Sequence, residues 1–367
     1  MAAKPILLSS DIYGRTGQAS AHPLSWPKTV PALDIIQRLE WFDDSCQIEC
    51  TKVHPRRLRS FHDQAYIDAA YTAEAEQCVS PLIRQKYGLG TGDNPIFPSV
   101  IERAATACGA ALKAAELLTD GGIVHSPLGG AHHVHPARAA GFGYFNDLAI
   151  GMLAMQDRGL RRIAYIDLDA HHGDGVEAAF AYDPNVLTFS IHEENCWPHT
   201  GTESDPHYGV YNLCVPERFN DSEMSYVVEN ALLPIVEKFA PEAIVIQAGA
   251  DSLEDDLMMK LGLSNRAYFK TIDALRNLAP RIWVTGGGGY NPWAVARCWA
   301  GIWCVLNDRD PVDEPPISDE QQIIDKVNQW PSVAKPPENW LSSLVDQTRD
   351  GVVRPCIKAA IGKLTDS

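Results

Sequence analysis

The stretch that decides the fold reads Tyr165-Ile-Asp-Leu-Asp-Ala-His-His-Gly-Asp-Gly175, and it holds three carboxylates and two imidazoles close together. The run before it, from Arg162 to Ile166, has the length and residue types of a buried strand, and the run from Val176 starts like a helix. Polar side chains are therefore expected where a strand ends and a helix begins, which is where open α/β sheets bind ligands.

The spacing of these polar residues predicts a metal-binding segment. Alternation along an extended chain sends Asp167, Asp169 and His171 to one side. Carboxylate and imidazole groups so close in sequence suit Zn²⁺ or a similar divalent ion. The competing interpretation is a polar turn in which Asp174 caps the helix. A cap needs one aspartate rather than three beside paired histidines, so the metal-binding interpretation is favoured.

The composition limits the class of protein. The 367 residues allow two domains or one large α/β domain, and a hydrophobic content of 45% supports a sizeable core. No apolar run is long enough to predict a membrane span. The net charge of -16 argues against general nucleic-acid binding and fits a solubilising surface or attraction of cationic substrates. Nine cysteines without a C-x-x-C pair indicate reduced thiols in a cytoplasmic protein.

Strand-like and helix-like runs alternate along most of the chain, which predicts a mainly parallel sheet covered on both faces. The predicted strands are 6–8, 122–125, 163–166, 186–190, 243–248 and 282–284. The predicted helices are 31–41, 64–75, 100–118, 147–156, 222–239, 264–278 and 292–306. From about residue 308 prolines and acidic residues increase, and a helix-like stretch follows at 340–346. We therefore expect one domain over residues 1–310 and a C-terminal extension over 311–367 that packs onto it.

A loop after the second predicted strand carries the adjacent His132 and His133. To act as base and acid they need separate carboxylate partners, and Asp167 and Asp174 are available for this role. The alternative is a solvent-exposed pair of loop histidines. His135, which precedes a proline, is expected at the surface.

Two further segments follow predicted strands. Asp251 comes after a strongly apolar run, where it is placed to join Asp169 and His171 as a third metal ligand or else to cap a helix. Tyr290 follows four glycines, which let the backbone approach another group closely. This loop lacks the Lys-Ser/Thr of a phosphate-binding P-loop, so the tyrosine hydroxyl is its chemical group, unless the ring only fills space.

Together these segments resemble the zinc-dependent histone deacetylase superfamily, closest to its class I and bacterial acetoin-utilisation branches. The matching segments are Gly-Ala-His-His at 130–133, Gly-Phe-Gly-Tyr-Phe-Asn-Asp at 141–147, the opening stretch extended to 177, Ser-Ile-His at 190–192, Gly-Ala-Asp-Ser-Leu at 249–253, and Gly-Gly-Gly-Gly-Tyr-Asn with Val-Ala-Arg-Cys-Trp within 286–299. They occur in the family's order over roughly residues 5 to 310, and as a linked set they are highly specific.

The resemblance implies an arginase-like α/β domain with a central eight-stranded parallel sheet and helices on both faces. It also implies a metal-dependent amidohydrolase that removes acetyl or other acyl groups from acylated lysine or related amines. The implied metal ligands are Asp169, His171 and Asp251, which would hold Zn²⁺, with Fe²⁺ as the alternative. The implied catalytic groups are His132 with Asp167, His133 with Asp174, and Tyr290, which would hydrogen-bond the substrate carbonyl.

The resemblance also implies contacts to substrate and to structural K⁺. The substrate contacts are Phe142 and Trp197 as walls of an acyl-lysine tunnel, Met258 near its rim, Gly288 at its floor and Asp93 as a rim carboxylate. The inner K⁺ site would use the side chains of Asp167 and Ser190 with the carbonyls of Asp169, His171 and Ile191. The outer site would use the carbonyls of Phe180, Asp183, Val186 and Tyr211.

The chain departs from the family at three places. Gly143 stands where the family often has cysteine, which leaves room below the metal, and Trp197 stands where phenylalanine is usual. The early motif His22-Pro-Leu-Ser-Trp-Pro-Lys is not followed by the arginine of class I enzymes. The family's internal acetate-release channel is therefore in question for this chain.

Two other functions share parts of this pattern. Arginase-like ureohydrolases have the same fold but use two Mn²⁺ and a second aspartate two residues after the first, where this chain has Leu253. A non-catalytic binder would be expected to lack a ligand or Tyr290, and all are present. Acylated protein lysine, acetylpolyamine and other small acylated amines fit the chemistry equally, and neither the oligomeric state nor the acyl-chain preference can be read from the residues.

Overall fold

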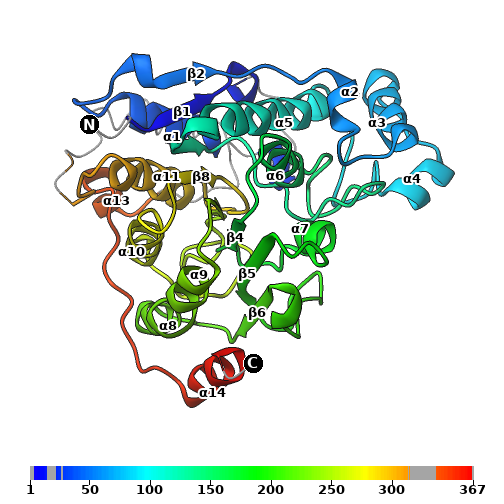
Figure 1. The fold of residues 1–367 in the computed structure, drawn as a ribbon. Coiled ribbons are helices and arrows are strands. Elements are labelled where there is room, and N and C mark those ends of the chain that lie inside the picture. The colour runs from blue at the N-terminus through cyan, green and yellow to red at the C-terminus, as the bar shows by residue number, and fades with distance from the viewer. Residues whose placement is uncertain (1–3, 15–21, 26–27, 313, 315–335, 366–367) are drawn as a thin grey trace.

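A parallel sheet of eight strands forms the centre of the molecule, in the order β2-β1-β3-β8-β7-β4-β5-β6 (Figure 1). The computed structural model describes residues 4–14, 22–25, 28–312, 314 and 336–365. The strands are β1 Ile6–Ser9, β2 Gln47–Glu49, β3 Gly122–Ser126, β4 Ile163–Asp167, β5 Val186–Glu193, β6 Val210–Val215, β7 Ala243–Gln247 and β8 Arg281–Thr285. The predicted fold class, with its eight-stranded parallel sheet, is confirmed.

All six strands predicted from the sequence occur, and the two that were missed, β2 and β6, form the outer edges of the sheet. β2 is only three residues long, and β6 has two half-buried positions, at Tyr211 and Cys214. Edge strands are commonly short and less apolar, so their sequence signal is weak. By contrast, β4 and β7 are buried at every position, which explains their continuous apolar runs.

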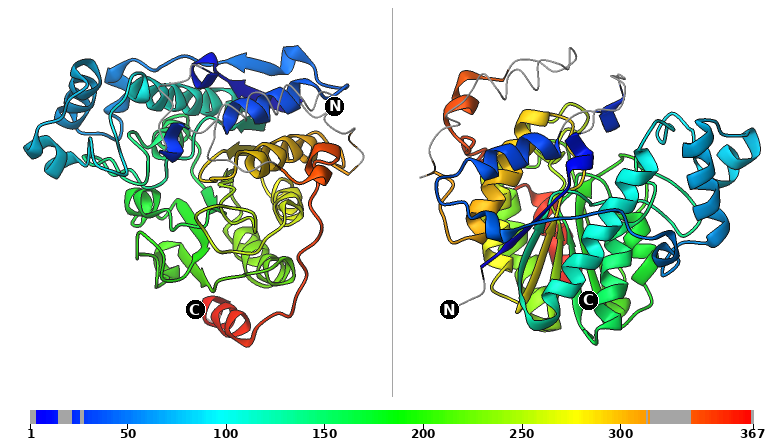
Figure 2. Two further views of the ribbon diagram at one scale, coloured as in Figure 1. Left: turned by 180° about the vertical axis from the view of Figure 1, so that it is seen from behind. Right: turned by 90° about the horizontal axis from the view of Figure 1, so that it is seen from above.

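Helices cover both faces of the sheet (Figure 2). One face carries α1 Thr29–Gln37, α8 Asp221–Val227, α9 Leu233–Phe239, α10 Asn265–Leu275 and α11 Pro292–Leu306. The other carries α5 Val100–Leu117, α6 Asp147–Asp157 and α7 Asp174–Phe180. Three further helices, α2 Pro55–Leu58, α3 Gln64–Glu76 and α4 Pro81–Tyr87, extend beyond α5. Among the described residues, no helix is long and apolar enough to cross a membrane.

The predicted helix over 222–239 is wrong as a single element. A π-helical turn at Val228–Leu232 separates α8 from α9. Pro234 lies at the start of α9 and has no N–H to donate to the preceding turn, so the regular α-helical ladder cannot run through this point.

The predicted helix at 340–346 is also wrong in its bounds, because α13 covers Glu338–Ser342 and the chain is extended at Ser343. Beyond it, Asn265 at the start of α10 donates to the Leu344 carbonyl at 2.8 Å and accepts from the Asp346 backbone N–H at 2.9 Å. These hydrogen bonds to Asn265 take the place of α-helical hydrogen bonds, so α13 ends at Ser342 and the following residues bind to α10.

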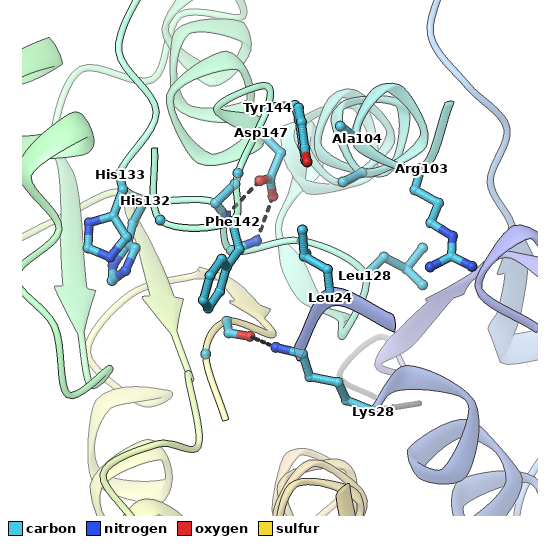
Figure 3. Close-up of a pocket in the computed structure, with 18 of the residues that line it drawn as sticks. Leu24, Lys28, Arg103, Ala104, Leu128, His132, His133, Phe142, Tyr144 and Asp147 are labelled. Carbon is cyan, nitrogen blue, oxygen red and sulfur yellow. Dashed lines mark hydrogen bonds between the residues drawn. The ribbon is translucent and has the colours of Figure 1, made fainter. Parts of the chain in front are cut away.

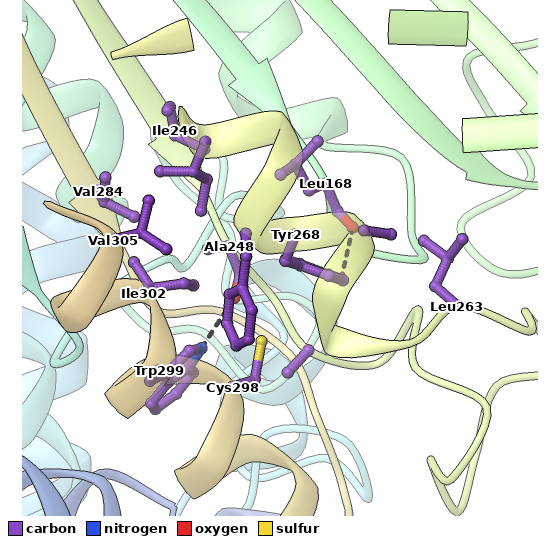
Figure 4. Packing of buried hydrophobic residues seen from close by; sticks show 14 of the residues in the cluster. Leu168, Ile246, Ala248, Leu263, Tyr268, Val284, Cys298, Trp299, Ile302 and Val305 are labelled. Atoms are coloured by element: carbon purple, nitrogen blue, oxygen red, sulfur yellow. Dashed lines mark hydrogen bonds between the residues drawn. The ribbon is translucent and has the colours of Figure 1, made fainter. Parts of the chain in front are cut away.

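The largest core cluster lies between the sheet and the face formed by α10 and α11 (Figure 4). Every residue of α11 is buried, and Trp299 donates its indole N–H to the Ala248 carbonyl at 2.9 Å, just beyond β7. Burying an aromatic or aliphatic side chain of this kind contributes roughly 1.5–3 kcal/mol. α11 therefore acts as a fixed wall behind the loop that precedes it.

Segments after residue 335 pack on the same face. Arg297 of α11 is 1% exposed and pairs with Asp346 at 2.6 Å, while its guanidinium lies over the ring of Trp340. The last helix, α14 Pro355–Thr365, buries Ile357, Ile361 and Leu364. Together these contacts hold the end of the described chain against the domain.

His62 links the outer helices to the main body. Its ring contacts the Pro136 carbonyl at 3.1 Å and accepts from the Asn146 backbone N–H at 3.0 Å. Asn146 caps α6, which begins beside the candidate site. Burial lowers the pKa of His62 from 6.5 to about 4.

We predict that His62→Gln makes the free energy of unfolding less dependent on pH. Below pH 6.5 the unfolded chain binds a proton at this histidine that the folded chain does not bind until about pH 4. The stability contributed by neutral His62 is therefore complete above pH 6.5 and is lost as the pH falls, by up to about 1.4 kcal/mol per pH unit. Urea unfolding at several pH values tests this, and equal pH slopes for both proteins would contradict it.

Candidate active site

Loops after four neighbouring central strands, β3, β8, β7 and β4, carry the predicted metal ligands, the tandem histidines and Tyr290. Parallel strands end at the same edge of a sheet, so groups far apart in sequence meet there. Asp167 ends β4, Asp251 follows β7, Tyr290 follows β8, and His132 and His133 follow β3.

The three predicted metal ligands converge on one point. The His171 Nδ1 atom lies 3.0 Å from Asp169 Oδ1 and 3.0 Å from Asp251 Oδ2. Their ligand atoms lie within 4.8 Å of one another, and no other such cluster of His, Cys, Asp or Glu occurs in the part of the chain that the structure describes. Asp169 is 1% exposed and Asp251 fully buried.

The electrostatics of this cluster fit a divalent cation. Burial and the charge of Asp169 raise the pKa of Asp251 to about 6. The two carboxylates outweigh burial and raise the pKa of His171 well above its usual range. The cluster holds two buried carboxylates and only one imidazole, so a positive charge is needed to stabilise it. A metal ion with oxygen and nitrogen ligands supplies that charge.

Groups behind the cluster fix its carboxylates. Asp169 Oδ2 accepts from the Gln247 side chain at 2.9 Å and from the Gly288 backbone N–H at 2.8 Å. Position 288 requires glycine because a Cβ there would lie 2.1 Å from Asp251 Oδ2. Gln247 was not identified from the sequence, where it reads as the polar end of an apolar strand.

The tandem histidines each have a separate carboxylate. His132 Nδ1 lies 2.8 Å from Asp167 Oδ2, and His133 Nδ1 lies 2.7 Å from Asp174 Oδ1. Because the Nδ1 atoms of both rings face carboxylates, the Nε2 atoms are the ring nitrogens available for proton transfer.

The two rings differ in their protonation. Burial would lower the pKa of His132, but the charges of Asp167 and Asp169 outweigh it and raise that pKa to about 9. Burial and the neighbouring His132 lower the pKa of His133 to about 3. With centroids 3.9 Å apart the rings repel as a pair of cations, so one is a proton donor and the other an acceptor.

His135, expected at the surface, is partly exposed and makes a contact that the sequence did not predict. Its Nε2 atom lies 3.0 Å from Asp174 Oδ2, and its side chain is 35% exposed. Asp174 therefore bridges His133 on the cavity side and His135 on the outer side. His135 and Arg138 are joined by backbone hydrogen bonds in a turn, and the H-P dipeptide alone does not reveal the contact with Asp174.

Tyr290 lines the cavity with a phenol that stays protonated. It is 6% exposed, and burial together with the charge of Asp251 raises the pKa of Tyr290 well above 10. The backbone N–H of Tyr290 donates to Asp256 at 2.7 Å, and Asp256 also accepts from the N–H of Met258 at 2.8 Å. Asp256, which the sequence reasoning missed, thus ties the Tyr290 loop to the rim.

A cavity of about 490 Å³ is lined by His132 and His133 (Figure 3) and by Asp169, His171 and Tyr290. The predicted substrate contacts all line it: Asp93, Phe142, Trp197, Met258 and Gly288. Trp197 is 40% exposed and Met258 48% exposed, so both are available at the mouth. The Trp197 ring packs edge-on against His133, and the Phe142 ring packs edge-on against Tyr290. These aromatic side chains form walls beside the tandem histidines and Tyr290.

The cavity continues past the histidines to Lys28 and Arg103 (Figure 3). Residues 26 and 27 of the early motif lie outside the described residues. The Lys28 ammonium donates to the Gly287 carbonyl at 3.3 Å and lies over the Tyr290 ring. Arg103 comes from α5, so a cationic residue lines the inner space although no arginine follows the early motif.

The predicted K⁺ ligands lie on and beside β4, β5 and β6. Asp167 and Ser190 are opposite each other in the β4–β5 ladder, with Ile191 next along β5. The backbone turns from Phe180 through Asp183, whose carbonyl accepts from the Val186 N–H at 3.0 Å. Tyr211 lies on β6 opposite Phe189.

Comparison with known proteins identifies the family. Residues 22–306 match the model of the histone deacetylase domain. The chain is 32% identical over 310 residues to the acetoin utilization protein AcuC of Bacillus subtilis, covering 80% of each chain. It is 33% identical over 269 residues to histone deacetylase 8 of Xenopus laevis, covering 71% of this chain and 82% of that protein.

Solved structures agree with this assignment. The crystal structure of a histone deacetylase homologue complexed with SAHA superposes with a TM-score of 0.89 at 30% identity, covering 99% of this chain and 100% of that one. A homologue from Aquifex aeolicus gives a TM-score of 0.88 at 31% identity, with the same coverage. The chain therefore belongs to the histone deacetylase family and is a deacetylase of that metal-dependent group.

Proposed function

We propose that this protein hydrolyses the amide bond of acylated lysine side chains or related acylated amines, with Asp169, His171 and Asp251 holding Zn²⁺ or Fe²⁺. The observation that carries the proposal is that this ligand cluster lies beside a cavity lined by two of its members, by two histidines on separate carboxylates, and by Tyr290. When bound, the metal would polarise the substrate carbonyl and lower the pKa of a water molecule.

The two histidines divide the proton transfers. His133 is neutral and buried, so it accepts the proton of the attacking water, while Asp174 stabilises the imidazolium that forms. His132, held protonated by Asp167 and Asp169, stabilises negative charge during the attack. A histidine then returns a proton to the nitrogen as the carbon–nitrogen bond breaks, and the products are an amine and a carboxylate.

Tyr290 stabilises the oxyanion that the attack creates. Its raised pKa keeps the phenol able to donate, and Asp256 fixes the backbone of its loop. A donor held in place before the reaction needs no reorganisation as charge develops.

The substrate side chain would pass between Phe142 and Trp197, with Asp93 and Met258 at the rim. The acidic net charge favours cationic substrates and does not separate protein lysine from acetylpolyamine. The two K⁺ sites, the division at residue 310 and a cytoplasmic location are parts of the same proposal. The arginase-like alternative needs a second metal, and no second ligand cluster accompanies the first among the described residues.

We predict that the protein binds one divalent ion per chain and that Asp251→Asn loses it. Removing one of three ligands leaves a site too weak to hold the ion, so added Zn²⁺ should raise the melting temperature of the parent protein and not of the variant. Elemental analysis and thermal unfolding measure this. Asp255→Asn, which changes a nearby acid that is 35% exposed, is the control. Two ions per chain would instead support a ureohydrolase-type centre.

We predict that Tyr290→Phe folds and binds metal but loses turnover by roughly a hundredfold or more, because one oxyanion donor is removed. The assay uses a fluorogenic acetyl-lysine peptide and an acetylated polyamine, each with and without a hydroxamate chelator. The substrate that is hydrolysed more efficiently shows whether the enzyme acts on lysine side chains or on polyamines. Parent-like turnover in the variant, or activity insensitive to the chelator, would refute the assigned site.

A further inference from the structure

The tandem histidines rest on carboxylates with different surroundings. Asp167, the partner of His132, is fully buried, and it also accepts from the Tyr165 phenol at 2.6 Å. Asp174, the partner of His133, opens α7, and its side chain is 17% exposed. The first carboxylate is therefore fixed from the protein interior, whereas the second lies near the surface, where water competes for its oxygens.

His135 occupies the second oxygen of Asp174. The His133 Nδ1 atom lies 2.7 Å from Oδ1, and the His135 Nε2 atom lies 3.0 Å from Oδ2. An ionised carboxylate only accepts hydrogen bonds, so the His135 Nε2 atom carries the proton of this bond. Burial would raise the pKa of Asp174, but the hydrogen bonds from the two imidazoles outweigh it and hold this pKa below its usual range. Asp174 therefore stays ionised, with one imidazole on each oxygen.

The turn that carries His135 is anchored to the outer helices. The His135 N–H donates to the Arg138 carbonyl at 3.1 Å, and the Arg138 N–H donates to the His135 carbonyl at 3.3 Å. Pro136 restricts the backbone between them, and its carbonyl accepts from the Asp63 N–H at 3.0 Å and contacts the His62 ring at 3.1 Å. Both of these residues directly precede α3, so the backbone of His135 is held in place independently of the substrate.

The second hydrogen bond restricts how the Asp174 carboxylate turns. The terminal torsion of an aspartate has a broad energy well, so a carboxylate bound by His133 alone could rotate and admit water to that bond. With His135 on the other oxygen, rotation breaks a hydrogen bond to an ionised group. The His133 ring, which lines the cavity, is thus kept in one orientation.

We propose that His135 is a positioning residue for the amide hydrolysis. It binds Oδ2 of Asp174, and this carboxylate then holds the His133 ring with its Nε2 atom ready to accept the proton of the attacking water. The inference rests on the proposed function of the same site. His135 is not among the residues that line the cavity, so its effect should appear in the chemical step and not in substrate binding.

Three variants separate the hydrogen bond from the size and polarity of the side chain. His135→Leu removes the donor. His135→Asn keeps an amide but places it near the Nδ1 position, too short to reach Asp174, whereas His135→Gln carries its amide nitrogen to the position of Nε2. His207→Leu, at an exposed histidine in the short helix Pro206–Tyr208, is the control and should keep the parent kinetics.

The kinetic test uses the acylated amine that the parent protein hydrolyses best. We expect His135→Leu and His135→Asn to lower kcat by about tenfold or more at an unchanged KM, and His135→Gln to keep kcat within about threefold of the parent value. If His135→Leu does not fold, the Asn and Gln variants make the same comparison.

A nuclear magnetic resonance measurement tests the same contact without turnover. In protein with isotope-labelled histidine, the Nδ1–H signal of His133 is assigned by its loss in His133→Asn. This proton should exchange slowly with water in the parent protein and in His135→Gln. It should exchange faster in His135→Leu and His135→Asn, because water then reaches the Asp174 carboxylate.

The possible outcomes distinguish this inference from the proposed function. Parent-like kcat in His135→Leu would overturn the inference, and so would equal losses in the Asn and Gln variants, because the hydrogen bond would then not matter. A rise in KM alone would also overturn it, because His135 would then act on substrate binding. A parent protein that hydrolyses no acylated amine would refute the proposed function, while unchanged exchange of the His133 proton in His135→Leu would refute the inference by itself.

Discussion

The buried negative charge of Asp169 and Asp251 is the constraint on which the site depends. Both carboxylates lie at the carboxyl edge of the sheet with almost no solvent contact, and one imidazole nitrogen lies 3.0 Å from each. Such an arrangement is costly without a compensating cation. Much of the surrounding structure serves to hold it, through Gln247, the Gly288 N–H and a glycine loop that no larger residue could replace.

The remaining groups are arranged around this charge. The carboxylates of β4 and of the start of α7 orient the tandem histidines, and the Asp169 charge helps to make one of them a cation. Asp256 accepts from the backbone N–H groups of Met258 at the rim and of Tyr290, so it ties the rim to the loop that carries the phenol. The metal-ligand cluster, the tandem histidines and Tyr290 are therefore each held by hydrogen bonds to a separate set of residues.

Helices α11 and α6 hold these groups in place from the two faces of the sheet. α11 is buried along its whole length behind the Tyr290 loop, and the C-terminal segment fixes it through the pair of Arg297 and Asp346. On the other face, Asp147 at the start of α6 binds the histidine loop. Both supports come from helices that begin or pack next to the sheet's carboxyl edge.

The sequence by itself determined the parallel α/β architecture and the chemical groups of the site. Apolar runs such as Ile163–Asp167 and Ala243–Gln247 predict strands clearly because central strands are buried on both faces. Asp, His and Tyr residues at the ends of such strands are seldom needed for packing, so they indicate a functional site. Edge strands β2 and β6 and the contact of His135 with Asp174 were decided only by tertiary structure. In each case the deciding interaction joins residues whose own sequence pattern is weak or ambiguous.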